Sequence, residues 1–307
     1  MSSTSVTQPL ECPDSVVTIT DDIGAVRRHR ARRVSRRTII DLTVAAILSV
    51  MVFIALFPYL YMLETSLKSN REFLGNAVTP TWPPHFGNFV TAWGDVAPYI
   101  LTSLVVAAVT TLGCIALGSV SGYVLSRFRF PGRNLFFGLI ALLLMVPNVA
   151  SLIPLFVLMK NLGLLNTYPD LIIPQLAAET VFAVVLMKTY IDQLPEELFD
   201  AAKVDGASAG RTYWSITLPL ARPIIGTVAL FSVIGVWSDY FWPELTIVTN
   251  SLRTVPVGVQ FFQGELTTAY GPLFAGYLIA SAPLLILFVV LARNFLAGIQ
   301  GGLAVDR

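Results

Sequence analysis

Three acidic side chains lie inside long apolar stretches of this chain, and they are its most unusual chemical feature. Glu179, Asp239 and Glu244 each stand within a run that is otherwise mostly hydrophobic. A charged side chain in a membrane costs about 2.5 to 3.5 kcal/mol on insertion scales, so such residues are functional candidates by default. Two roles are open for Glu179 and Asp239. They face a water-filled path or a partner subunit, or they make a buried hydrogen bond within the protein.

Other reactive groups are scarce. The two cysteines, Cys12 and Cys114, and the two histidines, His29 and His85, lie far apart, so they predict neither a disulfide framework nor a metal site. No Ser/His, Asp/Asp or His-rich constellation converges on the apolar runs, as an intramembrane enzyme requires. The sequence contains no Gly-Lys dipeptide, which the phosphate-binding loop G-x-x-x-x-G-K-[ST] needs. We expect a non-catalytic chain that binds no cofactor and hydrolyses no ATP itself.

Composition and run length predict an integral membrane protein. Of 307 residues, 55% are hydrophobic and 13% are charged, whereas a soluble domain has about 25% charged residues. A helix needs about 20 apolar residues to cross the bilayer. The runs are continuously apolar, unlike the alternating strands of a β-barrel. We therefore predict an all-α membrane helix bundle with six spans at residues 39–63, 99–125, 135–159, 171–190, 224–249 and 272–292.

The basic residues predict the orientation of these spans. Residues 1–38 form a tail whose polar first part indicates disorder and whose end carries a dense run of arginines. A cleaved signal peptide is disfavoured because the tail is long and no cleavage site follows the first apolar run. The arginines favour contact with anionic lipid over nucleic acid. With both termini cytoplasmic, sixteen Lys and Arg lie inside and four outside, as the positive-inside rule requires.

Residues 192–223, between the fourth and fifth spans, form the least typical part of the chain. Pro195 and the two glutamates after it are typical of a first helical turn. Apolar residues at helical spacing follow, and Gly206 predicts that this helix ends in a sharp turn. A second short helix is predicted at residues 208–218, ending at Pro219. A helix-turn-helix held beside the membrane favours a docking element.

This segment resembles the EAA loop of ABC importer permeases. The string Asp200-Ala-Ala-Lys-Val-Asp-Gly-Ala207 is followed by Ile216-Thr-Leu-Pro219 in the family's spacing, with Asp200 where the family usually has Glu. Weaker matches follow in the family's order from the first span onward, and they indicate the sugar branch of these permeases. They are residues 65–68, 88–89, 123–127, 147, 154, 163–167, 237–243, 253–256 and the Gly-containing tail from 295.

The resemblance implies the fold of a type I importer permease, with a permease domain at residues 39–307 and a core at residues 95–296. The implied function is transport of a carbohydrate, as an oligosaccharide, a disaccharide or a glycerol phosphate, across the cytoplasmic membrane. The implied partners are a second homologous permease, two ATP-binding subunits that hold ATP and Mg, an extracytoplasmic sugar-binding protein and membrane lipid. No nucleic acid partner is expected.

Glu179 and Asp239 are candidates for the translocation path because they are charged groups within the predicted spans, and Trp237 is a third candidate. The resemblance also assigns roles to residues. The outer segment at residues 250–271 faces the binding protein, with four candidate contacts: Gln260, Gln263, Gly264 and Glu265. Contacts to the ATPase subunits are expected from eight residues of the EAA-like segment (residues 192–223): Asp200, Ala201, Ala202, Asp205, Gly206, Ala207, Leu218 and Pro219.

An ion-coupled secondary transporter that uses Glu179 and Asp239 is the alternative function. Such a carrier needs ionisable groups within its spans. Against it, neither acid has a cationic partner within the predicted spans, and no inverted repeat of three plus three spans is visible in the sequence.

One pattern in the second span concerns packing rather than chemistry. Gly118 and Gly122 are separated by three residues, two of them serines. Such a small-xxx-small pattern lets another helix approach closely. We expect a neighbouring span to pack against this face.

Overall fold

The computed structural model describes residues 36–262 and 268–303. The chain divides into two compact units, residues 1–56 and residues 57–307. Helix α1 (Arg36–Ser66) begins in the first unit and ends in the second. All the regular elements of the described ranges are helices, which confirms the predicted all-α fold. The predicted polar tail at residues 1–38 lies almost wholly outside the described residues.

The candidate membrane spans agree with the predicted number. Within the described residues, four helices are long and apolar enough to cross a membrane, and two bent helix pairs raise the number to six if each pair is one span. The long helices are α1, α3 (Gly87–Arg127), α6 (Tyr168–Asp192) and α13 (Tyr270–Leu303). The pairs are α4 (Arg133–Leu143) with α5 (Asn148–Asn161), and Ala209–Leu220 with α10 (Arg222–Ser238).

Shorter elements connect these helices in the second unit. They are α2 (Asn70–Gly75), α7 (Glu196–Val204), α8 (Ala209–Thr212), a π-helix (Tyr213–Thr217), α9 (Leu218–Leu220), α11 (Phe241–Thr246), a 3₁₀ turn (Asn250–Leu252), α12 (Val255–Gly258) and a second 3₁₀ turn (Val259–Phe262).

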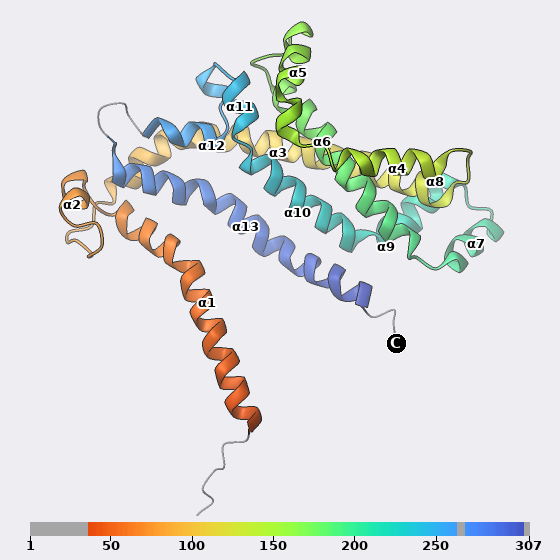
Figure 1. Ribbon diagram of the computed structural model, residues 1–307, viewed down its shortest axis with the longest axis horizontal. Coiled ribbons are helices and arrows are strands. Elements are labelled where there is room, and N and C mark those ends of the chain that lie inside the picture. Colours follow the sequence, from red (N-terminus) through yellow and green to blue (C-terminus); the bar gives the residue numbers. More distant parts are fainter. Residues whose placement is uncertain (1–35, 263–267, 304–307) are drawn as a thin grey trace, which may run out of the picture. The chain divides into compact units, whose positions relative to one another are not determined.

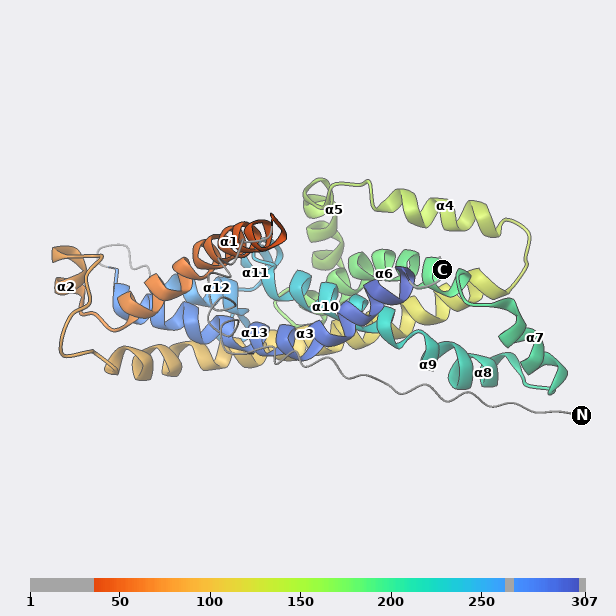
Figure 2. The same cartoon turned by 90° about the horizontal axis from the view of Figure 1, so that it is seen from below.

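The second unit is built around α3. Its 41 residues correspond to about 61 Å at 1.5 Å per residue, roughly twice the thickness of the hydrocarbon core. Helices α6, α10 and α13 pack against it and run beside it in Figures 1 and 2. One buried cluster lies along its N-terminal half and includes Tyr99 and Trp237. A second cluster, along its C-terminal half, includes Tyr123 and Met187.

Two glycines let α3 and α6 approach closely, as the small-xxx-small pattern predicts. A Cβ added at Gly118 would lie 2.7 Å from the Cβ of Ala183, and one added at Gly122 would lie 2.7 Å from the Cβ of Met187 and 2.9 Å from the backbone nitrogen of Lys188. Real Cβ atoms essentially never make such contacts. The absence of side chains at these two positions therefore sets the distance between the helices.

The third predicted span, residues 135–159, is apolar as expected but is not one straight helix. The chain leaves α4 after Leu143, and α5 begins at Asn148 on an axis bent by 96°, as Figure 2 shows. Pro147 between them has extended backbone angles, φ −63° and ψ 125°. A proline also disfavours the helical conformation in the residue before it. The expectation of one continuous helix is therefore wrong here.

The fifth predicted span, residues 224–249, is also shorter than expected. Helix α10 ends at Ser238, and Asp239 adopts an extended conformation with φ −70° and ψ 118°. The short helix α11 then begins at Phe241 and carries Glu244 as an exposed residue. Asp239 therefore sits where a helix ends, rather than within a continuous span.

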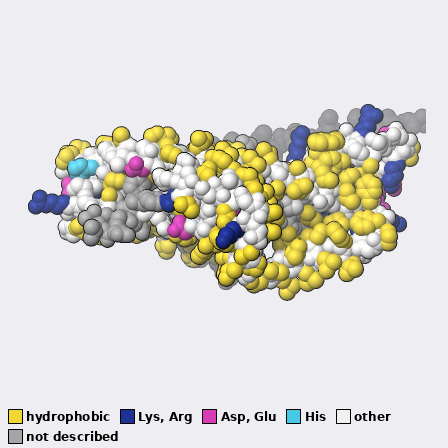
Figure 3. Space-filling model, turned by 90° about the horizontal axis from the view of Figure 1, so that it is seen from above, with side chains coloured by type: hydrophobic (Ala, Val, Ile, Leu, Met, Phe, Trp, Pro, Cys, Tyr) yellow, Lys and Arg dark blue, Asp and Glu magenta, His cyan; other side chains and the backbone are white. Residues whose placement is uncertain are grey.

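The surface has the distribution expected of a membrane protein. On the face drawn in Figure 3, hydrophobic side chains are spread over much of the surface, and Lys and Arg lie at both ends and at a few positions between them. Many of the exposed hydrophobic residues lie on α3, α4 and α5. Because this apolar surface covers the outside of the helices, it fits contact with lipid or with other membrane helices.

The N-terminal end of α3 is held in a tight polar joint, which we call the N-terminal joint (Ser66, Lys68, Asn88 and Gly271). The amide of Asn88 donates to the carbonyl oxygens of Ser66 and Lys68, each at 2.8 Å. Lys68 is fully buried and pairs with Glu64. Gly271 packs so closely that an added Cβ would overlap the Asn88 amide nitrogen and the Lys68 carbonyl oxygen. Three distant segments therefore meet with no space between them.

Candidate functional site

The EAA-like segment begins with the helix that the sequence predicts. Helix α7 starts after Pro195 and has Glu196 and Glu197 in its first turn, where acidic residues interact favourably with the helix dipole. It ends at Val204, and Gly206 in the following turn has a φ of +70°, the left-handed conformation that favours glycine. The backbone nitrogen of Gly206 donates to the carbonyl of Lys203 at 3.0 Å, and that of Ala207 donates to the carbonyl of Ala202 at 2.9 Å. This double closure is a Schellman turn.

The second half of the segment is helical, as predicted, and extends two residues beyond the predicted end. The Ser208 side chain accepts a hydrogen bond from the backbone of Arg211 at 3.3 Å and so caps α8. The chain then stays helical through a π-helical stretch to Leu220. Pro219 lies in the first turn of α9, rather than after the end of the helix. The sharp change of direction comes after Leu220, and α10 starts at Arg222 at an angle of 74° to the preceding helical stretch.

Three side chains on one face of α3 bind the EAA-like segment. Ser119 and Tyr213 share a hydrogen bond of 2.8 Å between their hydroxyl groups, and the hydroxyl of Tyr123 donates to the carbonyl of Ala209 at 3.1 Å. The guanidinium of Arg127 donates to the carbonyls of Ile191 at 2.5 Å and Leu194 at 3.0 Å.

Arg127 makes a further contact with α7. Its guanidinium carbon lies 3.7 Å from the centre of the Phe199 ring, in cation–π geometry. Residues 119, 123 and 127 are four apart, which places them on one side of a helix. This spacing of polar residues is visible in the sequence, although no contact with the EAA-like segment was expected from it.

The opposite side of α7 carries no contact of this kind. Phe199 and Ala202 are buried, whereas Leu198, Asp200 and Val204 are exposed, Val204 at 88%. Among the other expected ATPase contacts, Ala201, Asp205, Gly206 and Pro219 are exposed, and Ala207 and Leu218 are half-buried. A short amphipathic helix therefore presents apolar and acidic side chains outward.

Asp200 keeps its charge on this exposed face. Lys203, one turn later, donates to its carboxylate at 2.8 Å. This hydrogen bond and the charge of the ammonium lower the pKa of Asp200 from its ordinary value. Because the ordinary pKa of Asp is near 4, the carboxylate is ionised throughout the physiological range.

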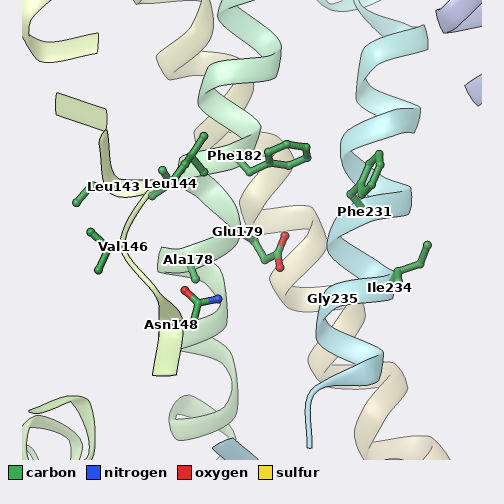
Figure 4. Close-up of a pocket in the computed structure, with 11 residues that line it drawn as sticks. Leu143, Leu144, Val146, Asn148, Ala178, Glu179, Phe182, Phe231, Ile234 and Gly235 are labelled. Atoms are coloured by element: carbon green, nitrogen blue, oxygen red, sulfur yellow. The ribbon is translucent and has the colours of Figure 1, made fainter. Parts of the chain in front are cut away.

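Glu179 lies at the wall of a cavity of about 590 Å³ between α6, α10 and the end of α4. Figure 4 shows its carboxylate extending from α6 toward Gly235 on α10. A Cβ added at Gly235 would lie only 2.5 Å from Glu179 Oε1, so the glycine makes space for the carboxylate. Phe182 and Phe231 meet edge to face, with ring centres 5.5 Å apart, on the same cavity.

Asp239 lines a second cavity of about 310 Å³, which shares Asn148, Ala178, Glu179 and Gly235 with the first. The side-chain amide of Gln175 donates a hydrogen bond to the Asp239 carboxylate. The structure thus brings the two predicted path acids to adjoining cavities. Sequence reasoning missed the amides of Asn148 and Gln175, because uncharged polar residues are not unusual enough in a span to attract notice.

The remaining predicted site residues lie elsewhere. Trp237 is 6% exposed, belongs to the buried cluster along α3, and lines neither cavity. Gln260 is exposed and accepts a hydrogen bond of 3.2 Å from the hydroxyl of Tyr240. Gln263, Gly264 and Glu265 lie outside the described residues. Within the parts of the chain that the structure describes, no group of three His, Cys, Asp or Glu side chains could hold a metal ion.

Comparison with known proteins identifies the family. Residues 114–300, more than half of the chain, match the model of the family described as "Binding-protein-dependent transport system inner membrane component". The chain belongs to this family. The permease is thus an inner membrane component of a transport system that works with a binding protein, and its family role is a non-catalytic one.

Curated relatives place the permease in the sugar branch. It is 32% identical over 249 residues to the probable ABC transporter permease protein YurM of Bacillus subtilis, covering 80% of this chain and 82% of that protein. It is 32% identical over 256 residues to the arabinooligosaccharides transport system permease protein AraQ of Halalkalibacterium halodurans, covering 81% and 91%. The permease is therefore an ABC transporter component of the type that takes up sugars.

A solved structure supports the fold. It is described as a bacterial ABC transporter involved in the import of the acidic polysaccharide alginate, and one of its chains matches this permease with a TM-score of 0.71 at 22% identity. The match covers 84% of this chain and 96% of that chain. The type I importer permease fold is thus confirmed. An ion-coupled carrier, the alternative function, gains no support from these relatives.

Proposed function

We propose that this chain is a pore-forming subunit of an ATP-driven carbohydrate importer, and that its EAA-like segment couples it to separate ATP-binding subunits. One observation carries the proposal. The segment binds α3 through a buried face that includes Phe199, while its other face exposes Leu198, Asp200 and Val204. A helix with one face bound to the protein and an apolar, charged outer face has the form of a docking element.

The contacts of Arg127 and Tyr123 suggest how motion passes into the membrane. A cleft that closes around α7 would move the segment as a rigid body, because its turns are closed by hydrogen bonds. The side chains of α3 that hold the segment would transmit this motion to α3. Helix α3 packs against α6 and α10, which carry Glu179 and Gly235. Motion of the segment would therefore reach the cavity walls.

The proposed assembly follows the family. Two ATP-binding subunits hold ATP and Mg, and a second, homologous permease completes the pore. Both termini are cytoplasmic, so the EAA-like segment faces the ATPases. An extracytoplasmic sugar-binding protein meets Gln260 and the residues after it. Glu179 and Asp239 line the translocation path, and Trp237 supports it from the buried cluster. Lipid surrounds the assembly, and nucleic acid has no role.

Substrate class is proposed from the relatives. AraQ is named for arabinooligosaccharide transport, which supports an oligosaccharide or a disaccharide as the solute. A glycerol phosphate is the second class, because the sugar branch of the family indicated by the sequence includes it.

Uptake by the intact complex tests the proposal. The chain is co-expressed with its partner permease, ATPases and binding protein, and uptake of radiolabelled maltose, trehalose and arabinooligosaccharides is measured. We expect uptake that requires ATP and persists when an uncoupler collapses the proton gradient. The chain expressed alone should show neither uptake nor ATPase activity. Uptake that stops with the proton gradient while ATP is maintained would contradict the proposal.

A further inference from the structure

The two adjoining cavities are lined by several polar side chains from otherwise apolar helices. They are lined by two carboxylates, Glu179 and Asp239, and by four neutral polar side chains: Asn148, Ser151, Gln175 and Ser238. Such groups are costly in lipid and are accepted where they face water or a solute. Apolar walls complete the cavities, with Phe182 and Phe231 in the larger one and Trp242 in the smaller.

The charge of this lining has one sign. Among the side chains that the structure describes on either cavity, two are acidic and none is Lys, Arg or His. The Asp239 carboxylate accepts hydrogen bonds from two uncharged groups, the side-chain amide of Gln175 and the backbone nitrogen of Trp242. In a setting of low dielectric, like charges repel strongly because little solvent screens them. A phosphate or a carboxylate on the solute would meet this repulsion with no cation to offset it.

The same lining suits the hydroxyl groups of a neutral sugar. A carboxylate accepts hydrogen bonds from two hydroxyls, whereas a side-chain amide both donates and accepts. These two kinds of group converge on the cavities from α5, α6 and the end of α10. Ser151 on α5 adds a hydroxyl, which donates to the carbonyl of Asn148 at 2.8 Å. Aromatic side chains supply apolar faces of the kind that line most small-molecule pockets.

Gly235 leaves room for the Glu179 carboxylate to reach the cavity. Its missing side chain leaves the space that Glu179 Oε1 occupies, since a Cβ there would approach that oxygen to 2.5 Å. The carboxylate therefore lies across the gap between α6 and α10, as Figure 4 shows. The position of the Glu179 carboxylate therefore depends on Gly235 of α10 as well as on α6 itself.

We propose that these cavities form a transient binding site for uncharged carbohydrate and that Glu179 and Asp239 exclude anionic sugars from the path. The inference rests on the proposed function and narrows it, because it selects neutral oligosaccharides or disaccharides over glycerol phosphates and uronic acids. Glu179 and Asp239 act as specificity residues, and Gly235 positions Glu179.

Cysteine reactivity tests the charge and the water access of the cavities without any transport step. Ser151→Cys is introduced into a chain carrying Cys12→Ser, and Cys114 is kept because it is 1% exposed. In the assembled complex, the reaction rate of the cysteine at position 151 is measured with two reagents. One is a cationic trimethylammonium methanethiosulfonate, and the other is its anionic sulfonate analogue. Clefts of one charge sign raise the local concentration of opposite ions by at least about tenfold. We expect the cationic reagent to react faster by about that factor.

Two neutral substitutions test whether Glu179 and Asp239 cause this charge preference. Adding Glu179→Gln and Asp239→Asn should lower the ratio of the cationic to the anionic rate at Ser151→Cys toward the ratio measured at Val248→Cys. Val248 is 79% exposed and lines neither cavity, so its ratio should not respond to the same changes. Equal rates of the two reagents at Ser151→Cys would overturn the proposal. Failure of both reagents to react would also overturn it, because the cavities would then be filled by protein or lipid.

A second experiment measures which solutes the complex takes up. The complex is offered maltose, trehalose and lactose as neutral solutes, and sn-glycerol 3-phosphate and digalacturonate as anionic ones. We expect ATP-driven uptake of at least one neutral sugar, protection of Ser151→Cys from the cationic reagent by that sugar, and no uptake of the anions. ATP-driven uptake of an anion would overturn the inference and leave the proposed function intact. If no solute is taken up and ATP has no effect, the proposed function itself fails, while the cysteine ratios still report on the cavities.

Discussion

The two ends of α3 hold their neighbours by different means. At the N-terminal joint, Asn88 and Gly271 meet backbone carbonyl groups directly, and Lys68 beside them is fully buried. At the C-terminal end, Tyr123 and Arg127 reach the EAA-like segment with long side chains, and the segment stays largely exposed. One end is closed at the level of the backbone, and the other is bridged by side chains.

The N-terminal joint therefore has the form of a fixed attachment, whereas the C-terminal end of α3 is suited to transmit motion. A close contact between backbone groups has no room to adjust, because interiors are packed at crystal-like density. A guanidinium that donates to two carbonyls can follow a small displacement, because its side chain has several rotatable bonds. Substitutions at the N-terminal joint should therefore affect stability. Substitutions at the C-terminal end should affect coupling.

The largest effect is expected from Gly271→Ala at the N-terminal joint. The new Cβ would overlap Asn88 and the Lys68 carbonyl oxygen, and the backbone oxygen has little freedom to yield. We expect a loss of about 3 kcal/mol in stability, at the upper end for overpacked sites. Thermal unfolding of the purified complex measures it. Gly75→Ala is the control, since an added Cβ there has nothing within 4 Å. Equal melting temperatures for the two variants would contradict the claim that the N-terminal joint is more tightly packed than the C-terminal end of α3.

Arg127→Ala should mainly affect coupling. It removes two hydrogen bonds from a charged donor, each worth about 1.5 to 3 kcal/mol, together with the contact to Phe199. We expect uptake to fall at least about tenfold, since that corresponds to 1.4 kcal/mol, while ATPase activity persists. Arg127→Lys should recover part of the uptake, and exposed Arg129→Ala should behave as wild type. Normal coupling in Arg127→Ala would contradict the proposed role of this side chain.

Gly206→Val is expected to have a smaller effect. Its φ of +70° costs other residues about 1 to 2 kcal/mol, although nothing lies within 4 Å of an added Cβ. The turn after α7 should distort and uncouple uptake from ATP turnover. Gly210→Val is the matched control, because Gly210 is equally open and lies within a helix. Efficient uptake per ATP in Gly206→Val would count against a rigid coupling turn.

Lys203→Ala should have the smallest effect. The pair it forms with Asp200 is exposed, and exposed pairs contribute little. Its loss lets the pKa of Asp200 rise toward its ordinary value. A carboxyl whose pKa is lowered in the folded state adds stability above its unfolded pKa and loses it as pH falls through the folded pKa. For Asp200, the pH range in which this stability is lost lies below about pH 4. Uptake from about pH 6 to pH 8 should therefore be unchanged. A shift of the uptake profile in that range would contradict this reading.

The EAA-like segment was the part best predicted from sequence. Gly206 and Pro195 mark the limits of α7 through local backbone preferences, which act over a few residues. The close approach at Gly118 and Gly122 was also predicted, because the small side chains that permit it are visible in the sequence. The break at Pro147 and the end of α10 at Ser238 were missed, since hydrophobic composition continues across both.

The sequence by itself determined that the chain is a membrane helix bundle, that it carries a helix-turn-helix segment at residues 192–223, and that acidic residues lie in its apolar runs. These properties depend on composition and local spacing. Only the tertiary structure decided that Glu179 and Asp239 line adjoining cavities, that Trp237 lies in a buried cluster, and that one face of α3 holds the EAA-like segment. Such juxtapositions depend on how helices pack against each other, and the packing depends on residues such as Gly235, whose effect appears only when a second helix is in place.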